Sequence, residues 1–161
     1  MYMGVLGNRP DLFSDSEYIG IYGGNYNDYD ISPEALEDEA FAALIKEAEK
    51  YLGYPYVWGG SKPETSFDCS GFVSWVVNHS GWNVGRLTAQ GLYNICTPVS
   101  AAQVKPGDLV FFVGTYDTPG VSHVGIYVGN NKMIHCGDPI SYTDLTYDYW
   151  QQHFYAYGRL H

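Results

Sequence analysis

The chain carries little positive charge. It has eight lysine and arginine residues against 18 aspartate and glutamate residues, a formal net charge of −10. Contacts to nucleic-acid phosphates need clustered Lys and Arg side chains, so this balance argues against a nucleic-acid partner. No apolar run is long enough to span a bilayer, and residues 1–15 lack the basic and then apolar pattern of a signal peptide. We therefore expect neither nucleic-acid binding nor membrane insertion.

Cysteine is also scarce. Cys69, Cys96 and Cys136 are three in number, and an odd count is not a disulfide framework. A Cys96–Cys136 bridge that leaves Cys69 as a thiol is possible at this level; otherwise Cys96 and Cys136 are expected to be small buried residues. No two cysteines have the short spacing of a zinc knuckle or ribbon, which argues against a structural metal site.

A chain of 161 residues is most simply one domain with a real core. Residues 1–32 are rich in tyrosine, glycine, asparagine and aspartate without a clear period, and this pattern predicts a linker or surface arm. Ser32, Pro33 and Glu34 then form a helix start, and the apolar spacing predicts one helix that Gly53 ends. The expected folded domain is therefore residues 33–161.

The period changes along that domain. A second helix is predicted over residues 69–79, and Thr88 is a possible cap of a short third helix. The later part of the chain alternates as strands do. The predicted strands are residues 109–113, 121–129, 132–136 and 154–160. Helices first and strands second, with short connections, predict an α+β domain with helices on an antiparallel sheet.

Cys69 is placed at the start of the second predicted helix. The positive end of the helix dipole favours a thiolate there, and a thiolate is the nucleophilic form of cysteine. Asp68 before it has two interpretations: a helix cap, or a carboxylate that pairs with an amino group of a substrate. As a fixed negative charge it would oppose the effect of the dipole on the thiol.

Among the histidines, His123 and His135 are the candidates for a general base. Each lies in a predicted strand, and Gly129-Asn130-Asn131 is a hairpin signal between the two strands. A turn centred near Asn130 places His123 roughly opposite residue 137, so both histidines lie on one face.

This arrangement predicts Cys69 as nucleophile, His123 as base and His135 as the group that orients the base. The backbone N–H of Cys69 and a side-chain donor such as Tyr56 are candidates for stabilising an oxyanion. Metal binding by His123, His135 and Cys136 is the competing interpretation, and it lacks a further ligand at a convincing spacing.

The motifs resemble the NlpC-type cell-wall endopeptidases, which are papain-like cysteine peptidases of bacteria. Six pieces arrive in the family order, and the resemblance covers roughly residues 41–160. The pieces are Tyr51 to Gly60, Asp68-Cys69-Ser70-Gly71, Arg86 to Gln90, Lys105 to Phe112, Ser122 to Gly129, and Ile134-His135.

The resemblance implies hydrolysis of the bond between γ-D-glutamate and a diamino acid in peptidoglycan stem peptides, without a cofactor or metal. It implies that Cys69, His123 and His135 are catalytic. The residues it implies at the substrate are Tyr56, Asp68, Ser70 and Thr88. We expect a monomeric catalytic part of a larger secreted or wall-associated bacterial protein, whose signal peptide is not in this chain. Two-headed wall lysins carry such a domain at the C-terminus.

Three alternatives stay open at this level. A cysteine–histidine amidase would cut the link between glycan and peptide. A catalytically silent wall-binding module would be expected to lack the cysteine or a histidine, and this chain keeps all three. An acyltransferase on the same fold is more remote.

Overall fold

The computed structural model describes residues 29–161, so the predicted linker lies outside the described residues except for residues 29–32. The helices are α3 (Pro33–Leu36), α4 (Glu39–Glu49), α5 (Cys69–Asn78), α6 (Ala89–Ile95) and α7 (Asp148–His153). The strands are β1 (Ser61–Lys62), β2 (Ser66–Phe67), β3 (Thr97–Val99), β4 (Leu109–Val113), β5 (Val121–Gly129), β6 (Lys132–Cys136), β7 (Ile140–Asp144) and β8 (Phe154–Arg159). None of the helices in residues 29–161 combines the length and the apolar character needed to cross a bilayer.

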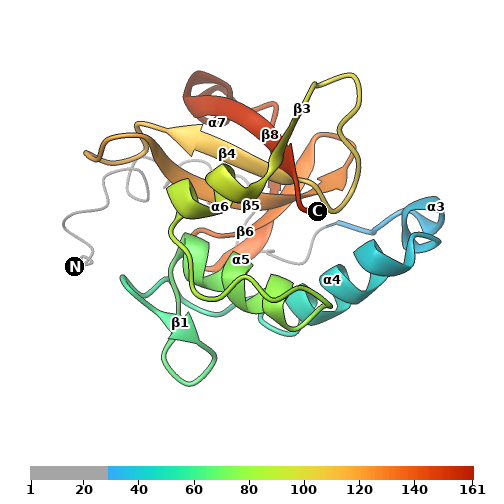
Figure 1. Ribbon diagram of the computed structural model, residues 1–161, viewed down its shortest axis with the longest axis horizontal. Coiled ribbons are helices and arrows are strands. Elements are labelled where there is room, and N and C mark those ends of the chain that lie inside the picture. Colours follow the sequence, from blue (N-terminus) through green and yellow to red (C-terminus); the bar gives the residue numbers. More distant parts are fainter. Residues whose placement is uncertain (1–28) are drawn as a thin grey trace.

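Six strands form one antiparallel sheet in the order β3-β8-β4-β5-β6-β7. Helices α4 and α5 lie side by side along one face of this sheet, and α7 lies beyond its opposite face (Figure 1). The predicted class, an α+β fold with N-terminal helices on an antiparallel sheet, is confirmed. All four predicted strands are present, and β8 ends one residue earlier than predicted.

The single helix predicted after Ser32 is wrong in one respect, because the chain forms two helices there. Asp38 adopts an extended backbone (φ −78°, ψ 110°), and its carboxylate accepts hydrogen bonds from the N–H groups of Ala40 and Phe41. An N-cap residue with extended dihedrals starts a new helix rather than continuing the old one. Because other acidic residues surround Asp38, the sequence pattern did not indicate this second helix cap.

The hairpin between β5 and β6 has the predicted turn, and its strands reach the predicted pairing through an irregularity in register. Asn130 and Asn131 have φ values of 53° and 57°, the left-handed pair that a type I′ turn requires. Gly129 pairs with Lys132 across the turn, and an irregularity between Tyr127 and Gly129 then shifts the register by one residue, so that Tyr127 pairs with Met133 and Ile126 with Ile134. This register places alternate residues of both strands on a common face, which decides where the histidines lie.

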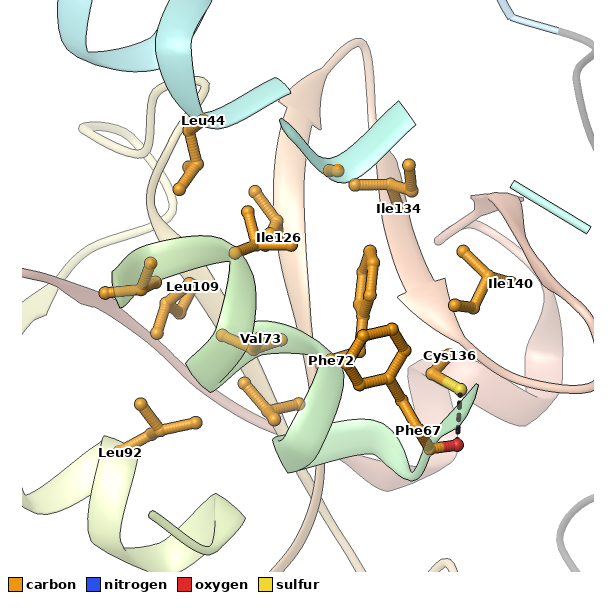
Figure 2. Close-up of a cluster of buried hydrophobic side chains, with 14 of the residues drawn as sticks. Leu44, Phe67, Phe72, Val73, Leu92, Leu109, Ile126, Ile134, Cys136 and Ile140 are labelled. Atoms are coloured by element: carbon orange, nitrogen blue, oxygen red, sulfur yellow. Dashed lines mark hydrogen bonds between the residues drawn. The ribbon is translucent and has the colours of Figure 1, made fainter. Parts of the chain in front are cut away.

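The two faces of the sheet are covered by different apolar clusters. The larger cluster fills the space between the helices and the sheet, and Figure 2 shows its centre. The smaller cluster lies on the other face, where α7 contributes Trp150. Its buried members are Val110, Phe112, Tyr127, Met133, Leu145 and Trp150.

Helix α5 approaches the preceding loop so closely that it needs a glycine. A Cβ atom on Gly71 would lie 2.0 Å from the carbonyl oxygen of Gly60 and 2.9 Å from Oδ1 of Asp68. The Gly60 carbonyl is held in place because it accepts the backbone N–H of Asp68 at 3.0 Å. The first turn of α5 is therefore fixed against backbone atoms, which cannot yield as a flexible side chain can.

We predict that Gly71→Ala lowers the free energy of unfolding by about 1–3 kcal/mol, because the added methyl group would force the helix away from Gly60. Urea denaturation monitored by circular dichroism measures this loss. Gly91→Ala is the matched control, since that helical glycine faces only side-chain atoms, the nearest at 3.3 Å. Equal stability of the two variants would contradict the close-approach argument.

Candidate active site

Cys69 is the first residue of α5, and Asp68 caps that helix. The Asp68 carboxylate accepts the N–H of Gly71 at 2.7 Å, so the cap that the sequence suggested is present. The Cys69 side chain is 5% exposed, and its Sγ lies 3.8 Å from the carbonyl oxygen of Ser122. Ser122 directly precedes His123 in β5. The thiol therefore lies against the strand that carries His123 and at the positive end of a helix, whose dipole favours a thiolate.

His123 and His135 are in direct contact. Nε2 of His123 lies 2.8 Å from Nδ1 of His135, and the two rings meet edge to face at 83°. Both side chains are buried, at 1% and 2% exposure. The prediction that they share a face of the hairpin is confirmed. Nε2 of His123 is engaged with His135, so a proton exchanged between His123 and a thiol would pass through its Nδ1.

Two residues that the sequence reasoning missed surround the histidine pair. The ring centroid of Trp150 lies 5.4 Å from that of His123 and 5.1 Å from that of His135. Thr143 places its Oγ1 2.8 Å from Nε2 of His135. Both residues come from elements that the sequence analysis did not predict, α7 and β7. The alternating apolar pattern of residues 140–144 was the signal available for β7.

The metal interpretation of His123, His135 and Cys136 is wrong, because Cys136 faces the other way. Neighbouring residues of a strand point to opposite faces, and Cys136 belongs to the core cluster under the helices. Its Sγ donates a hydrogen bond to the carbonyl oxygen of Phe67 at 3.2 Å (Figure 2). Within residues 29–161, no three His, Cys, Asp or Glu side chains gather as they would to hold a metal ion.

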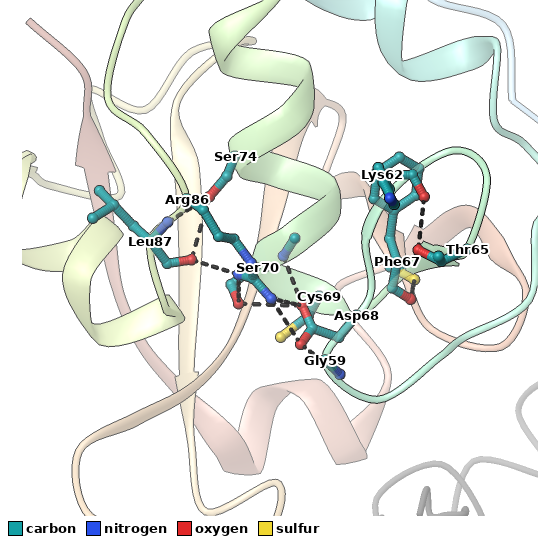
Figure 3. A network of polar contacts seen from close by, with 12 residues as sticks. Gly59, Lys62, Thr65, Phe67, Asp68, Cys69, Ser70, Ser74, Arg86 and Leu87 are labelled. Atoms are coloured by element: carbon teal, nitrogen blue, oxygen red, sulfur yellow. Dashed lines mark hydrogen bonds and ion pairs between the residues drawn. The ribbon is translucent and has the colours of Figure 1, made fainter.

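Arg86 organises the polar contacts at the first turn of α5 (Figure 3). Its NH2 group donates to both Asp68 oxygens, at 2.9 and 3.0 Å, and its NH1 group donates to Oγ of Ser70 at 2.8 Å. Asp68 also accepts the N–H of Gly59 at 3.1 Å. The Arg86 guanidinium offsets the Asp68 carboxylate charge beside Cys69. The carboxylate therefore opposes the effect of the helix dipole on the thiol less than a lone negative charge would. Sequence reasoning placed Arg86 in a motif but missed this role.

Thr88 and Tyr56, the other predicted substrate residues, both have structural roles. Oγ1 of Thr88 accepts the N–H of Gly91 at 3.0 Å and begins α6, as its cap pattern predicted. The Tyr56 backbone forms a bridge with Phe67, the residue before Asp68, and its side chain is buried at 6% exposure. Tyr56 and Ser70 thus lie on the segments that flank Cys69, and Thr88 follows Arg86 by two residues.

The cysteines are all free thiols, so the possible Cys96–Cys136 bridge is not formed. Cys136 is fully buried as expected, while Cys96 is only half-buried. Burial, and secondarily the negative charge of Asp108, raise the pKa of the Cys96 thiol to about 12. Cys96 is therefore a protonated, unreactive thiol at neutral pH.

Known proteins resemble this chain in sequence and in fold. The chain is 43% identical over 135 residues to the bifunctional muramidase/DL-endopeptidase CwlT of Bacillus subtilis, an alignment of 83% of this chain and 41% of that protein. It is 36% identical over 132 residues to the murein DD-endopeptidase MepH of Escherichia coli, across 79% of this chain and 48% of that one.

A solved structure from Staphylococcus aureus, described as similar to a lipoprotein of the NLP/P60 family, superposes with a TM-score of 0.74 and 43% identity, across 83% of this chain and 45% of that chain. The chain thus spans less than half the length of each of these relatives. The model of the NlpC/P60 family matches residues 53–159. This match covers the candidate nucleophile, both histidines and the sheet that holds them, and the chain belongs to the NlpC/P60 family.

Proposed function

We propose that this chain is a cysteine endopeptidase of peptidoglycan that cleaves the bond between γ-D-glutamate and the diamino acid of the stem peptide. The observation that carries the proposal is a thiol at the N-terminus of α5, against the strand whose histidine is paired with a second buried histidine. The family match and the DL-endopeptidase named among the relatives support the substrate and the bond.

The proposed mechanism begins with proton transfer from Sγ of Cys69 to His123, and His135 accepts a hydrogen bond from the imidazolium that forms. The thiolate attacks the carbonyl carbon of the γ-glutamyl bond. The N–H of Cys69, at the first position of α5, would donate to the resulting oxyanion. His123 returns its proton to the leaving amine of the diamino acid, and a thioester of the D-glutamyl fragment remains. Water then hydrolyses the thioester and regenerates the thiol.

The substrate would lie beside the Arg86 cluster. A stem peptide carries carboxylates and amino groups, and this cluster presents groups of both signs next to the nucleophile. Asp68 shares its carboxylate with Arg86, whose side chain is 37% exposed. We therefore retain Tyr56, Asp68, Ser70 and Thr88 as the proposed substrate residues and add Arg86 as a partner for a stem carboxylate.

A DD-endopeptidase is the second candidate, because MepH, a relative of similar coverage, is named for that activity. It would cut cross-links between stems rather than the stem itself. The amidase alternative would cut at the glycan. The silent-module alternative is weakened because the cysteine and both histidines are present in a compact arrangement.

The setting of the domain is also a proposal. We place residues 33–161 as the catalytic domain and residues 1–32 as a linker or surface arm, in a monomer that forms the catalytic part of a larger protein. The names of the relatives, a muramidase/endopeptidase and a murein endopeptidase, support a secreted or wall-associated location.

We predict that the protein releases D-glutamate-ended fragments from purified muropeptides, and that Cys69→Ala releases none while keeping its circular dichroism spectrum and melting temperature. Mass spectrometry of two sets, with diaminopimelate and with lysine, identifies the bond and the preferred diamino acid. Conversion of cross-linked dimers to intact monomers would point to the DD-endopeptidase instead, and a free lactoyl carboxyl to the amidase. Cleavage that persists in Cys69→Ala would overturn the nucleophile assignment.

We predict that His123→Ala loses more activity than His135→Ala, because His123 exchanges the proton with the thiol whereas His135 orients the His123 ring. The measurement is kcat/KM on the muropeptide that the wild-type protein cleaves best. The reverse ranking would show that the two roles are exchanged.

We predict that iodoacetamide alkylates Cys69 much faster than Cys96 in the native protein at neutral pH. The helix dipole favours the Cys69 thiolate, whereas a pKa of about 12 keeps the Cys96 thiol protonated until strongly alkaline pH. Peptide mapping after timed labelling compares the two sites within one sample. Faster labelling at Cys96 would contradict the assignment of the reactive thiol.

A further inference from the structure

Thr143 occupies a defined place beside the histidine pair. In the β6–β7 ladder His135 pairs with Ser141 and Met133 with Thr143, so Thr143 is the diagonal neighbour of His135 on the same face of the sheet. Its Oγ1 lies 2.8 Å from Nε2 of His135. Both side chains are buried, Thr143 at 0% and His135 at 2% exposure. This hydrogen bond is on the side of His135 away from His123.

The direction of that hydrogen bond sets the protonation pattern of both rings. A neutral imidazole carries its proton on one nitrogen and accepts on the other. If Nε2–H of His135 donates to Thr143, then Nδ1 of His135 accepts from Nε2–H of His123. His123 then has an unprotonated Nδ1 that can take the thiol proton. If the Thr143 hydroxyl donated to Nε2 of His135 instead, His135 would carry its proton on Nδ1 and donate it to Nε2 of His123. Nδ1 of His123 would then already carry a proton and could not accept one from a thiol.

We propose that Thr143 is a positioning residue for catalysis: its hydroxyl accepts Nε2–H of His135 and thereby holds both histidines in the tautomers that make His123 a base. The inference rests on the roles proposed above for Cys69, His123 and His135. The same acceptor is needed after proton transfer. The His123 imidazolium then donates Nε2–H to His135, which can accept only while its own proton stays on Nε2.

The surroundings make the hydroxyl hard to replace. Trp150, itself 2% exposed, contacts both imidazole rings and limits the access of water that could accept the Nε2 proton. A buried N–H without an acceptor is costly, so loss of the hydroxyl disfavours the required tautomer. For histidines that bind metals, loss of such an orienting partner typically costs about 10- to 100-fold in affinity or activity, and we expect a similar loss of kcat/KM here.

The test uses three variants of the full chain. Thr143→Val keeps the shape and removes the hydroxyl, and Thr143→Ser restores the hydroxyl without the methyl group. Tyr142→Phe is the matched control, because Tyr142 precedes Thr143 in β7 and points to the other face of the sheet. This substitution also removes a buried hydroxyl group, one that is hydrogen-bonded to Glu49. The readouts are kcat/KM, melting temperature and the rate of Cys69 alkylation by iodoacetamide as a function of pH.

We expect Thr143→Val to lower kcat/KM about 10- to 100-fold with little change in KM. The rise of the alkylation rate should move to higher pH, because the imidazolium that stabilises the thiolate loses its hydrogen-bond acceptor. Thr143→Ser should restore most of both properties, and Tyr142→Phe should lower only the melting temperature. An unchanged alkylation profile in Thr143→Val would overturn the proposal.

Nitrogen NMR of the wild-type imidazoles provides a second measurement that depends on no variant. We expect the Nε2–H tautomer at His135, and the Nδ1–H tautomer would overturn the proposal even if Thr143→Val fails to fold. Alkylation and NMR need no peptidoglycan. A shifted alkylation profile in a protein that cuts no muropeptide would therefore support the role of Thr143 while the proposed substrate falls.

Discussion

The structure depends on the contact between the N-terminal turn of α5 and the sheet. Most of this helix is buried: Cys69 to Ser74, Val76 and Val77 all have little exposed surface. The Gly60–Gly71 approach fixes the depth of the first turn, and the contact of Cys69 with the Ser122 carbonyl fixes its position along β5. A reactive cysteine has to be placed to within a fraction of an ångström relative to its base. Here the helix meets a backbone carbonyl on each side, that of Gly60 at Gly71 and that of Ser122 at the thiol of Cys69, and backbone atoms yield less than flexible side chains.

The two faces of the sheet carry different groups: one face packs against the core under the helices, and the other carries the two histidines. Residues of one parity in β5 and β6, such as Val124 and Ile134, build the core under the helices. The alternate residues of these strands include His123 and His135, which point to the other face and lie beside Trp150 of the smaller cluster. Cys69 approaches from the helix side at the start of β5 and so reaches the sheet close to the histidine face. The alternation of a strand is therefore what allows one hairpin to serve the core and the site at once.

The scarce cations of this acidic chain are used to hold carboxylates. Both arginines of the described residues, Arg86 and Arg159, bind an aspartate through two nitrogen–oxygen contacts. Asp68, held by Arg86, caps α5, and Asp108, held by Arg159, is buried directly before β4. Arg159 uses two nitrogens for the two oxygens of Asp108, a bidentate geometry that suits a planar guanidinium better than an ammonium group, whereas Arg86 contacts both oxygens of Asp68 through one nitrogen. In each case the arginine offsets a charge that the fold needs for its hydrogen bonds but that would be costly alone.

The sequence by itself determined the fold class, the helix start at Cys69 and the hairpin turn, because caps, turns and strand alternation are local rules. It also indicated that His123 and His135 share a face, but the register that puts them there depends on the irregularity between Tyr127 and Gly129, which the sequence did not indicate. It could not show that Asp38 divides the first helix, because an aspartate between other acids is as compatible with a helical turn as with a cap. The tertiary structure alone brought Arg86 to Asp68, Trp150 to both rings and Thr143 to His135. Those contacts join segments far apart in the chain, and no local spacing encodes which distant side chains meet.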